Sequence, residues 1–152
     1  MNLFNNLANI QHFTFKAIAG DKSSTNWNGL GEGKVYTALK GNKLFFKEEG
    51  SFKLDHNPKA TKIFNEYIWT QLSENKLSLS HSRFGYDNEV ILFELEPITI
   101  THWASTKPHI CGKDLYSAKL EIIDSTIKLE WNITGPKKDE HISYFYGYHQ
   151  VK

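Results

Sequence analysis

The sequence contains one cysteine, Cys111, in 152 residues, so no disulfide can form within the chain. No apolar stretch approaches the roughly 20 residues that a membrane-spanning helix requires. The first residues have neither the basic flank nor the long apolar run of a secretory signal. Neither sign of charge is in excess, because 18 Lys and Arg balance 17 Asp and Glu. The net charge of +1 argues against electrostatic capture of nucleic acid or of an anionic membrane. These absences predict a cytoplasmic protein that binds neither nucleic acid nor membranes.

Aromatic residues, in contrast, are abundant: 4 Trp, 7 Tyr and 10 Phe make up 14% of the chain. With a hydrophobic content of 39%, this composition is typical of a globular domain and not of a disordered chain. A length of 152 residues suits one domain, which we expect to cover residues 1–152. Aromatic rings favour β-structure and supply flat surfaces that can line a pocket.

The hydrophobic pattern predicts a short N-terminal helix followed only by strands. Leu3, Leu7 and Ile10 lie at helical spacing, and Asn2 can cap the first turn. Ten later segments show short apolar runs or a period of two, bounded by turn residues. They are residues 11–19, 30–39, 43–49, 61–71, 76–84, 89–96, 98–102, 113–123, 126–134 and 140–149. Because no helix of ordinary length separates them, we expect an antiparallel meander.

The connections between these strands form a short set and a long set, which alternate along the chain. The short ones are residues 41–42, 73–76, 97 and 124–125; the long ones are residues 20–29, 50–60, 84–88, 103–112 and 135–140. In an up-and-down meander, successive connections alternate between the two ends of the sheet. The sequence therefore predicts an all-β, antiparallel up-and-down β-barrel of about ten strands, with a tight end and a loop-rimmed mouth. This barrel is favoured over an open sandwich, in which Greek-key connections would mix the lengths.

The turn at residues 124–125 fixes the register of the two strands that flank it. A two-residue hairpin pairs Ile122 with Ile127 and, further along, places Ala118 opposite Trp131. The other face of this pair is charged, so these side chains are expected in the interior. A small side chain opposite a large one supports the register.

The same register points Asp114 and Tyr116 inward at the mouth. The turn at residues 41–42 places Val35 opposite Glu48 on the inner face, so Glu48 joins Asp114 near the mouth. A barrel of this strand number has more interior than side chains usually fill. We therefore expect a ligand cavity.

Two other registers are less determined. For residues 61–71 and 76–84, the preferred register turns Tyr67 and Trp69 inward beside Ser80 and Ser82. The reverse arrangement, which turns His81 and Arg83 inward, stays open. In residues 140–149, the sequence does not decide whether the face that carries Tyr144 or the face that carries Phe145 points into the barrel.

Metal or nucleophilic chemistry finds little support in the sequence. His109 and Cys111 can ligate zinc, but the chain has no second pair of ligands at zinc-site spacing. As a nucleophile and base, the same two residues lack a third group that orients the base. The glycines of residues 29–33 precede no helix, so they suggest strand curvature and not a phosphate-binding loop.

Several motifs are spread along nearly the whole chain: residues 29–36, residues 44–50, Tyr67 with Trp69, an H-x-C-x-x-D-x-Y motif (His109, Cys111, Asp114, Tyr116) and a W-x-I-x-G-P-x-K-D motif (Trp131, Ile133, Gly135, Pro136, Lys138, Asp139). In these motifs the chain resembles an uncharacterised bacterial family known as domain of unknown function 6314. Phe46, Ile133 and Glu140 depart from the family pattern. The resemblance implies a calycin-like, lipocalin-type barrel and no established activity.

The function that we predict is the binding of a small, largely apolar or aromatic molecule inside the barrel. The expected walls are Tyr67, Trp69, Tyr116 and Trp131, and the expected polar groups at the mouth are Glu48, His109, Asp114 and Lys138. No cofactor is indicated, and the oligomeric state is open.

Three alternatives remain. The first is an enzyme that uses Asp114 or Glu48 as acid or base, with Tyr116 as a hydrogen-bond donor. The second is a haem-binding, nitrobindin-like barrel, in which one of three histidines would be the axial ligand: His102, His141 or His149. The third is an interaction module with an exposed apolar patch on its outer wall.

Overall fold

A computed structural model describes residues 3–21, 23, 28–83, 85 and 87–148. The described part of the chain has one short helix, α1 (Leu3–Leu7), and is otherwise built from strands. The strands are β1 (Ile10–Ala19), β2 (Gly29–Lys40), β3 (Lys43–Leu54), β4 (Thr61–Ser73), β5 (Lys76–His81), β6 (Val90–Pro97), β7 (His102–Ala104), β8 (His109–Cys111), β9 (Asp114–Ile123), β10 (Thr126–Thr134) and β11 (Asp139–Tyr148). Among these residues, no helix is long and apolar enough to cross a membrane.

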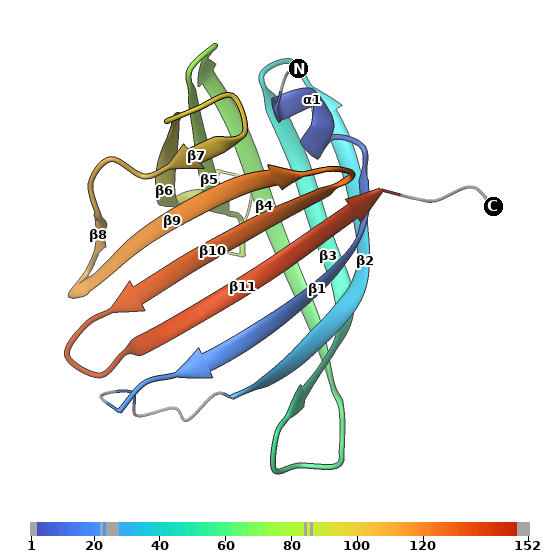
Figure 1. Ribbon diagram of the computed structural model, residues 1–152, viewed down its shortest axis with the longest axis vertical. Helices are drawn as coiled ribbons and strands as arrows, with labels where there is room; N and C mark the ends of the chain where they lie inside the picture. Colours follow the sequence, from blue (N-terminus) through green and yellow to red (C-terminus); the bar gives the residue numbers. More distant parts are fainter. Residues whose placement is uncertain (1–2, 22, 24–27, 84, 86, 149–152) are drawn as a thin grey trace.

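The strands form a closed antiparallel barrel (Figure 1). Around the barrel the order is β1, β2, β3, β4, β5, β6, β7, β9, β10 and β11, and β11 pairs with β1 to close the ring. The additional strand, β8, pairs with the same edge of β9 as β7 does, but nearer to the start of β9. The predicted all-β barrel of about ten strands, with a short N-terminal helix, is thus confirmed.

The two ends of the barrel differ. Figure 1 shows α1 beside the turn between β2 and β3, at the end where the short connections lie. Leu3, Phe4 and Leu7 of α1 are buried, and the Thr37 hydroxyl donates a hydrogen bond to the Ala8 carbonyl. A helix of this length depends on such packing for its stability. The long connections lie at the other end, which we call the mouth.

The short turns set the predicted registers correctly. Ile122 pairs with Ile127, Ala118 with Trp131, and Val35 with Glu48. Asp124, with φ of 51°, adopts the left-handed conformation that a tight hairpin requires. Local turn geometry was sufficient to predict these pairs.

The predicted strand at residues 98–102 is misplaced, since β7 begins only at His102. Residues 98–101 form a turn in which the Ile98 amide donates to the His102 carbonyl over 2.7 Å. The hydroxyls of Thr99 and Thr101 bond to the His102 ring, and such side-chain bonds compete with a strand ladder. β7 still occupies this position in the barrel. Each later connection therefore lies at the end of the barrel that was predicted for it.

The predicted register between β4 and β5 is wrong by one residue. Tyr67 pairs with His81 and Trp69 with Leu79, because the ladder shifts between Gln71 and Ser73. An additional residue in one strand moves every later partner to the other face. Tyr67 and Trp69 face inward as preferred, but His81 shares their face, while Ser80 and Ser82 bond to Glu89 and Glu66 outside the ring.

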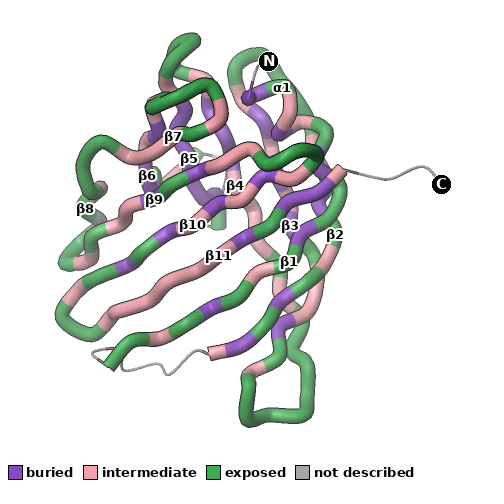
Figure 2. The backbone as a smooth tube through the Cα atoms, in the orientation of Figure 1, coloured by how far each residue is buried: buried purple, intermediate pink, exposed green. Residues whose placement is uncertain are grey.

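The structure also decides the orientation of β11. Tyr144 and Tyr146 are 3% and 2% exposed and point inward, whereas Phe145 is 41% exposed on the outer wall. Figure 2 shows buried positions recurring between exposed or half-buried ones along β1 and β10. His149 lies outside the described residues.

Glycines allow β2 and β3 to approach closely on the inner face. Gly33 pairs with Gly50, and a Cβ atom at Gly33 would overlap the carbonyl oxygen of Glu49. This agrees with a role of the glycine-rich segment in curvature and close packing.

Candidate functional site

The inner face of the barrel is more exposed near the mouth than near α1. Close to α1 the inward side chains are buried, among them Leu44, Phe46 and Trp69. Toward the mouth Phe52 and Ile133 are buried as well, but several inward side chains are only half-buried, namely Phe15, Ile63, Asn65, Tyr67, Tyr116 and Ile142. In a closed barrel, an inward side chain reaches solvent only through the mouth or through a gap in the wall. Solvent therefore reaches these six side chains at the mouth or at gaps in the wall, and we call the region that they share the mouth hollow.

A carboxyl group lies next to the mouth hollow, as the direct register partner of Asn65. Glu48 of β3 is 0% exposed, and three neutral side chains donate hydrogen bonds to it. The Tyr144 hydroxyl and the Asn65 amide donate to Oε1 over 3.0 Å and 3.2 Å, and the Tyr146 hydroxyl donates to Oε2 over 2.6 Å. We call Glu48, Asn65, Tyr144 and Tyr146 the floor cluster.

The sequence positions this carboxyl through strand periodicity. Leu44, Phe46 and Glu48 alternate with outward residues, so Glu48 occupies an inward position that the pattern of β3 reserves for apolar side chains. Asn65 is its direct partner on β4. Tyr144 and Tyr146 reach it from β11, which lies across the barrel and not beside β3.

Burial raises the pKa of Glu48 from 4.5 to about 7, because desolvation penalises the charged form more than the hydrogen bonds of Tyr146, Asn65 and Tyr144 stabilise it. Glu48 therefore changes its protonation state much closer to neutral pH than an ordinary glutamate does. Among the described residues, none of the ion pairs includes this carboxyl.

Tyr67 contacts the floor cluster. Its hydroxyl interacts with that of Tyr144, and burial together with the charge of Glu48 raises the pKa of Tyr67 well above its usual value. The phenol therefore keeps its proton. The Trp131 ring lies edge-on to Tyr67, with centroids 6.1 Å apart, and stacks on Tyr144 at 6.2 Å. These rings form a continuous aromatic wall from the floor upward.

A gap in the barrel wall also leads to this region. β5 pairs with β4 only from Tyr67 onward, whereas β3 pairs with β4 from Thr61 onward. A pocket of about 420 Å³ lies along the unpaired part of β4. It is lined by Phe64, Asn65, Glu66, Tyr67, His81 and Arg83. Asn65 and Tyr67 are thus reachable from outside the barrel as well as from the mouth.

The rim of the mouth carries an ion pair. Lys138, in the connection between β10 and β11, lies 3.3 Å from the Asp114 carboxylate. Partial burial lowers the pKa of Lys138, but Tyr116 and Asp114 outweigh this effect and raise it. A Cβ atom at Gly135 would overlap Asp114, so the loop packs directly on this carboxylate.

The structure brings most of the predicted site residues to one end of the barrel. Tyr67 and Tyr116 belong to the mouth hollow, whereas Glu48 and Trp131 are buried. Asp114 and Lys138 form the rim of the mouth, and His109 of β8 pairs with Tyr116. Trp69 lies deeper: it is 1% exposed and its ring packs edge-on against Phe93.

Sequence reasoning missed Asn65, Tyr144 and Tyr146 as partners of Glu48. Their inward positions follow the period of two in β4 and β11, which was a usable signal. Contact between β3 and β11, however, depends on how the barrel closes. No local pattern in the sequence contains that information.

Two of the three histidines proposed as haem ligands face outward. His102 lies 3.3 Å from Glu121 on the outer wall, and His141 bonds to Asn132. The third, His149, lies outside the described residues. The described residues contain no group of three or more His, Cys, Asp or Glu side chains that could hold a metal ion.

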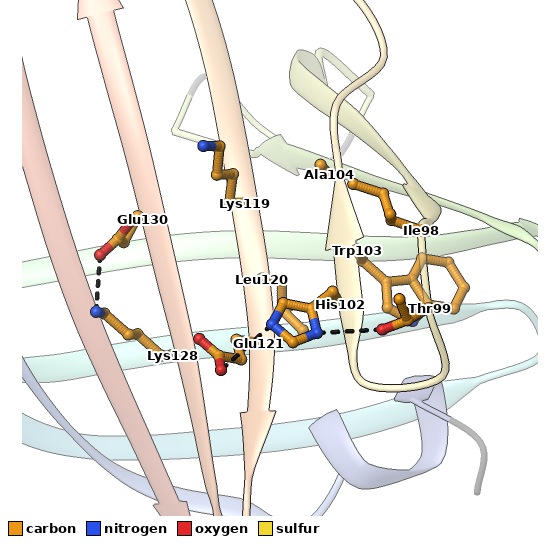
Figure 3. Close-up of a pocket in the computed structure, with 10 residues that line it drawn as sticks. All are labelled: Ile98, Thr99, His102, Trp103, Ala104, Lys119, Leu120, Glu121, Lys128 and Glu130. Carbon is orange, nitrogen blue, oxygen red and sulfur yellow. Dashed lines mark hydrogen bonds and ion pairs between the residues drawn. The ribbon is translucent and has the colours of Figure 1, made fainter.

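A second pocket, of about 450 Å³, opens beside β7 and β9 (Figure 3). His102 connects Thr99 with Glu121 there, and Lys128 lies 2.9 Å from Glu130. The polar side chains of this pocket are thus largely paired with one another. None of its lining residues is a fully buried carboxyl without an ion-pair partner, as Glu48 is.

Fold and site together define a closed β-barrel with a buried, titratable carboxyl among aromatic side chains. The chain belongs to the family of unknown function DUF6314, which matches residues 13–147. No curated protein and no solved structure matches the chain.

Proposed function

We propose that this protein binds a small molecule in the mouth hollow, with the aromatic wall holding an apolar or aromatic body and the floor cluster holding a polar group. The observation that carries the proposal is Glu48, a fully buried carboxyl that accepts a hydrogen bond from Asn65, a residue that lines the pocket beside β4. Such sites typically combine a mainly apolar lining with a few fixed polar groups.

The floor cluster has the properties of a prearranged binding group. Three donors on two other strands fix both oxygens of Glu48, and the stacked rings of Tyr144 and Tyr146 hold those donors in place, with centroids 5.0 Å apart. Burying a carboxyl costs free energy that an apolar residue at this position would not cost. Ligand recognition is a benefit that can offset this cost.

The proposal is tested by native mass spectrometry of the protein as expressed, followed by a thermal-shift screen of small aromatic compounds. A ligand at 100 times its Kd stabilises the folded state by about 2.7 kcal/mol. Tyr116→Ala, in the mouth hollow, is expected to weaken binding of every hit. Tyr36→Ala is the matched control, because Tyr36 is 51% exposed on the outer wall.

The proposal fails if the hits bind both variants as tightly as the parent protein. It also fails if a structure of a complex places the ligand in the pocket beside β7 and β9.

A second candidate is acid–base catalysis by Glu48, which its pKa of about 7 favours, since a general acid or base works best near the operating pH. The test incubates each identified ligand with the parent protein and with Glu48→Gln. Catalysis predicts a mass change of the ligand with the parent protein only. An unchanged ligand with both leaves binding as the function.

A further inference from the structure

The gap beside β4 holds a pocket that draws its lining from both faces of the barrel wall. This pocket of about 420 Å³, which we call the gap pocket, lies where β5 no longer pairs with β4. Asn65 and Tyr67 are inward residues that it shares with the mouth hollow, whereas Phe64 and Glu66 alternate with them on the outward face. A ligand in the gap pocket therefore meets inward side chains without entering through the mouth.

Arg83 brings a positive charge to the gap pocket. It is the only arginine in the sequence, in which every other basic residue apart from histidine is a lysine. Arg83 is exposed and follows β5, at a turn that the Gly85 amide closes by donating to the Ser82 carbonyl over 2.9 Å. A guanidinium presents a rigid, planar fork of N–H donors that matches the two oxygens of a carboxylate, which the ammonium of lysine does not.

The charge of Arg83 also reaches the inward side chains of the pocket. Burial lowers the pKa of the His81 ring, and the charge of Arg83 lowers it further. Burial and the charge of Glu48 raise the pKa of Tyr67, and Arg83 acts in the opposite direction. Two side chains on the inner face thus lie within the electrostatic range of this guanidinium.

Glu66 is the acidic residue of the lining, and it has a cation beside it. The Lys47 ammonium lies 4.0 Å from its Oε1 atom, and the Ser82 hydroxyl donates to its Oε2 atom over 3.4 Å. Of the charged groups Lys47, Glu66 and Arg83, two are positive and one is negative. Binding of a monoanion at the gap pocket therefore balances these charges, whereas binding of a cation adds to their excess.

Glu48 opposes an anion in the gap pocket only when it is ionised. It is fully buried and does not line this pocket, which it reaches through the hydrogen bond from Asn65. Because burial raises the pKa of Glu48 to about 7, this carboxyl largely keeps its proton at pH 5.5. A carboxylic acid of ordinary pKa is still ionised there.

The remaining lining supplies a second donor and an apolar surface. The Asn65 amide carries two N–H groups, of which one donates to Glu48, so the other can donate to a ligand. Phe64 is 55% exposed, and Tyr67 is half-buried. An apolar body placed against these two rings loses contact with water, which favours binding.

We propose that the gap pocket binds the carboxylate of a small organic acid, with Arg83 and the Asn65 amide holding the carboxylate and the rings of Phe64 and Tyr67 contacting the apolar body. This inference rests on the proposed binding function, because Asn65 and Tyr67 belong to both the gap pocket and the mouth hollow, and it adds the chemical class of the ligand.

The test uses probes that share a phenyl ring and differ in charge: phenylacetate, 2-phenylethanol, 2-phenylethylamine and phenyl phosphate. Titration calorimetry at pH 5.5 is expected to show phenylacetate binding at least about tenfold more tightly than the alcohol, with the amine weakest. Phenyl phosphate, which also exists as a dianion, is expected to bind no more tightly than phenylacetate.

Variants locate the two parts of the ligand. Arg83→Gln is expected to bring phenylacetate and the alcohol to equal affinity, whereas Arg83→Lys, which keeps the charge but loses the fork, binds phenylacetate with intermediate affinity. Lys16→Gln removes the same charge from an exposed position on β1, so it is the matched control and keeps the preference for phenylacetate. Phe64→Ala is expected to weaken phenylacetate and the alcohol by a similar factor, because it removes a contact of the phenyl ring and leaves Arg83 in place.

The outcomes separate the inference from the proposed function. Equal affinity for phenylacetate and the alcohol, a preference for the amine or the phosphate, or a preference for phenylacetate that survives Arg83→Gln overturns the inference and leaves small-molecule binding in place. Binding of none of the probes at millimolar concentration also overturns it. The proposed function is overturned with it only if native mass spectrometry and the thermal-shift screen find no ligand either.

Discussion

Replacing Glu48 with Gln should change how the stability of this protein depends on pH. The pKa of Glu48 is about 7 in the folded state, against 4.5 for an ordinary glutamate. Below pH 4.5 the carboxyl is protonated in both the folded and the unfolded states, so burial carries no charge penalty. Between the two values the unfolded state loses its proton and the folded state keeps it, so stability falls as pH rises. Above about pH 7 the loss is complete.

The size of the effect follows from the pKa shift. One pKa unit corresponds to about 1.4 kcal/mol, so a shift from 4.5 to about 7 costs on the order of 3 kcal/mol at pH 8. Gln has the shape of Glu but does not titrate in this range. Relative to the parent protein, Glu48→Gln should therefore gain about 2–3 kcal/mol of unfolding free energy between pH 5 and pH 8.

Urea denaturation at several pH values measures this gain directly, because a change in midpoint at constant slope reports stability. Any pH-independent effect of the substitution, such as the altered hydrogen bonding to Tyr144 and Tyr146, cancels in the comparison between pH values. Glu49→Gln on the exposed side of β3 is the control and should follow the parent curve. Parallel curves for Glu48→Gln and the parent protein would refute the raised pKa and the reasoning built on it.

Three further substitutions test the packing around the site. Tyr146→Phe removes the 2.6 Å hydrogen bond to Glu48, so at pH 8 we expect a loss of about 1–3 kcal/mol in urea and a smaller loss at pH 5, and an equal loss at both would contradict this account. Ala118→Leu adds volume opposite Trp131 and should cost about 1–3 kcal/mol, which a lower thermal midpoint would show. Gly33→Ala forces a Cβ against the Glu49 carbonyl, and an unchanged midpoint would disprove this close approach.

Much of the barrel could be predicted from short-range signals. The period of two, the absence of helices between strands and the alternation of short and long connections together imply a closed antiparallel barrel. The errors occurred at two local irregularities of the backbone. Hydroxyl bonds to His102 replaced a strand with a turn, and the shift between Gln71 and Ser73 moved His81 onto the inner face.

For the site, the sequence by itself determined that Glu48, Tyr116 and Trp131 point into the barrel, because tight turns fix the register and the register fixes the face. Only the tertiary structure decided that Tyr144 and Tyr146 donate to Glu48. These residues are 96 and 98 positions away from it in the chain. Their meeting depends on the closure of the whole ring, and closure is the sum of every strand's tilt, bend and register, which no single turn specifies.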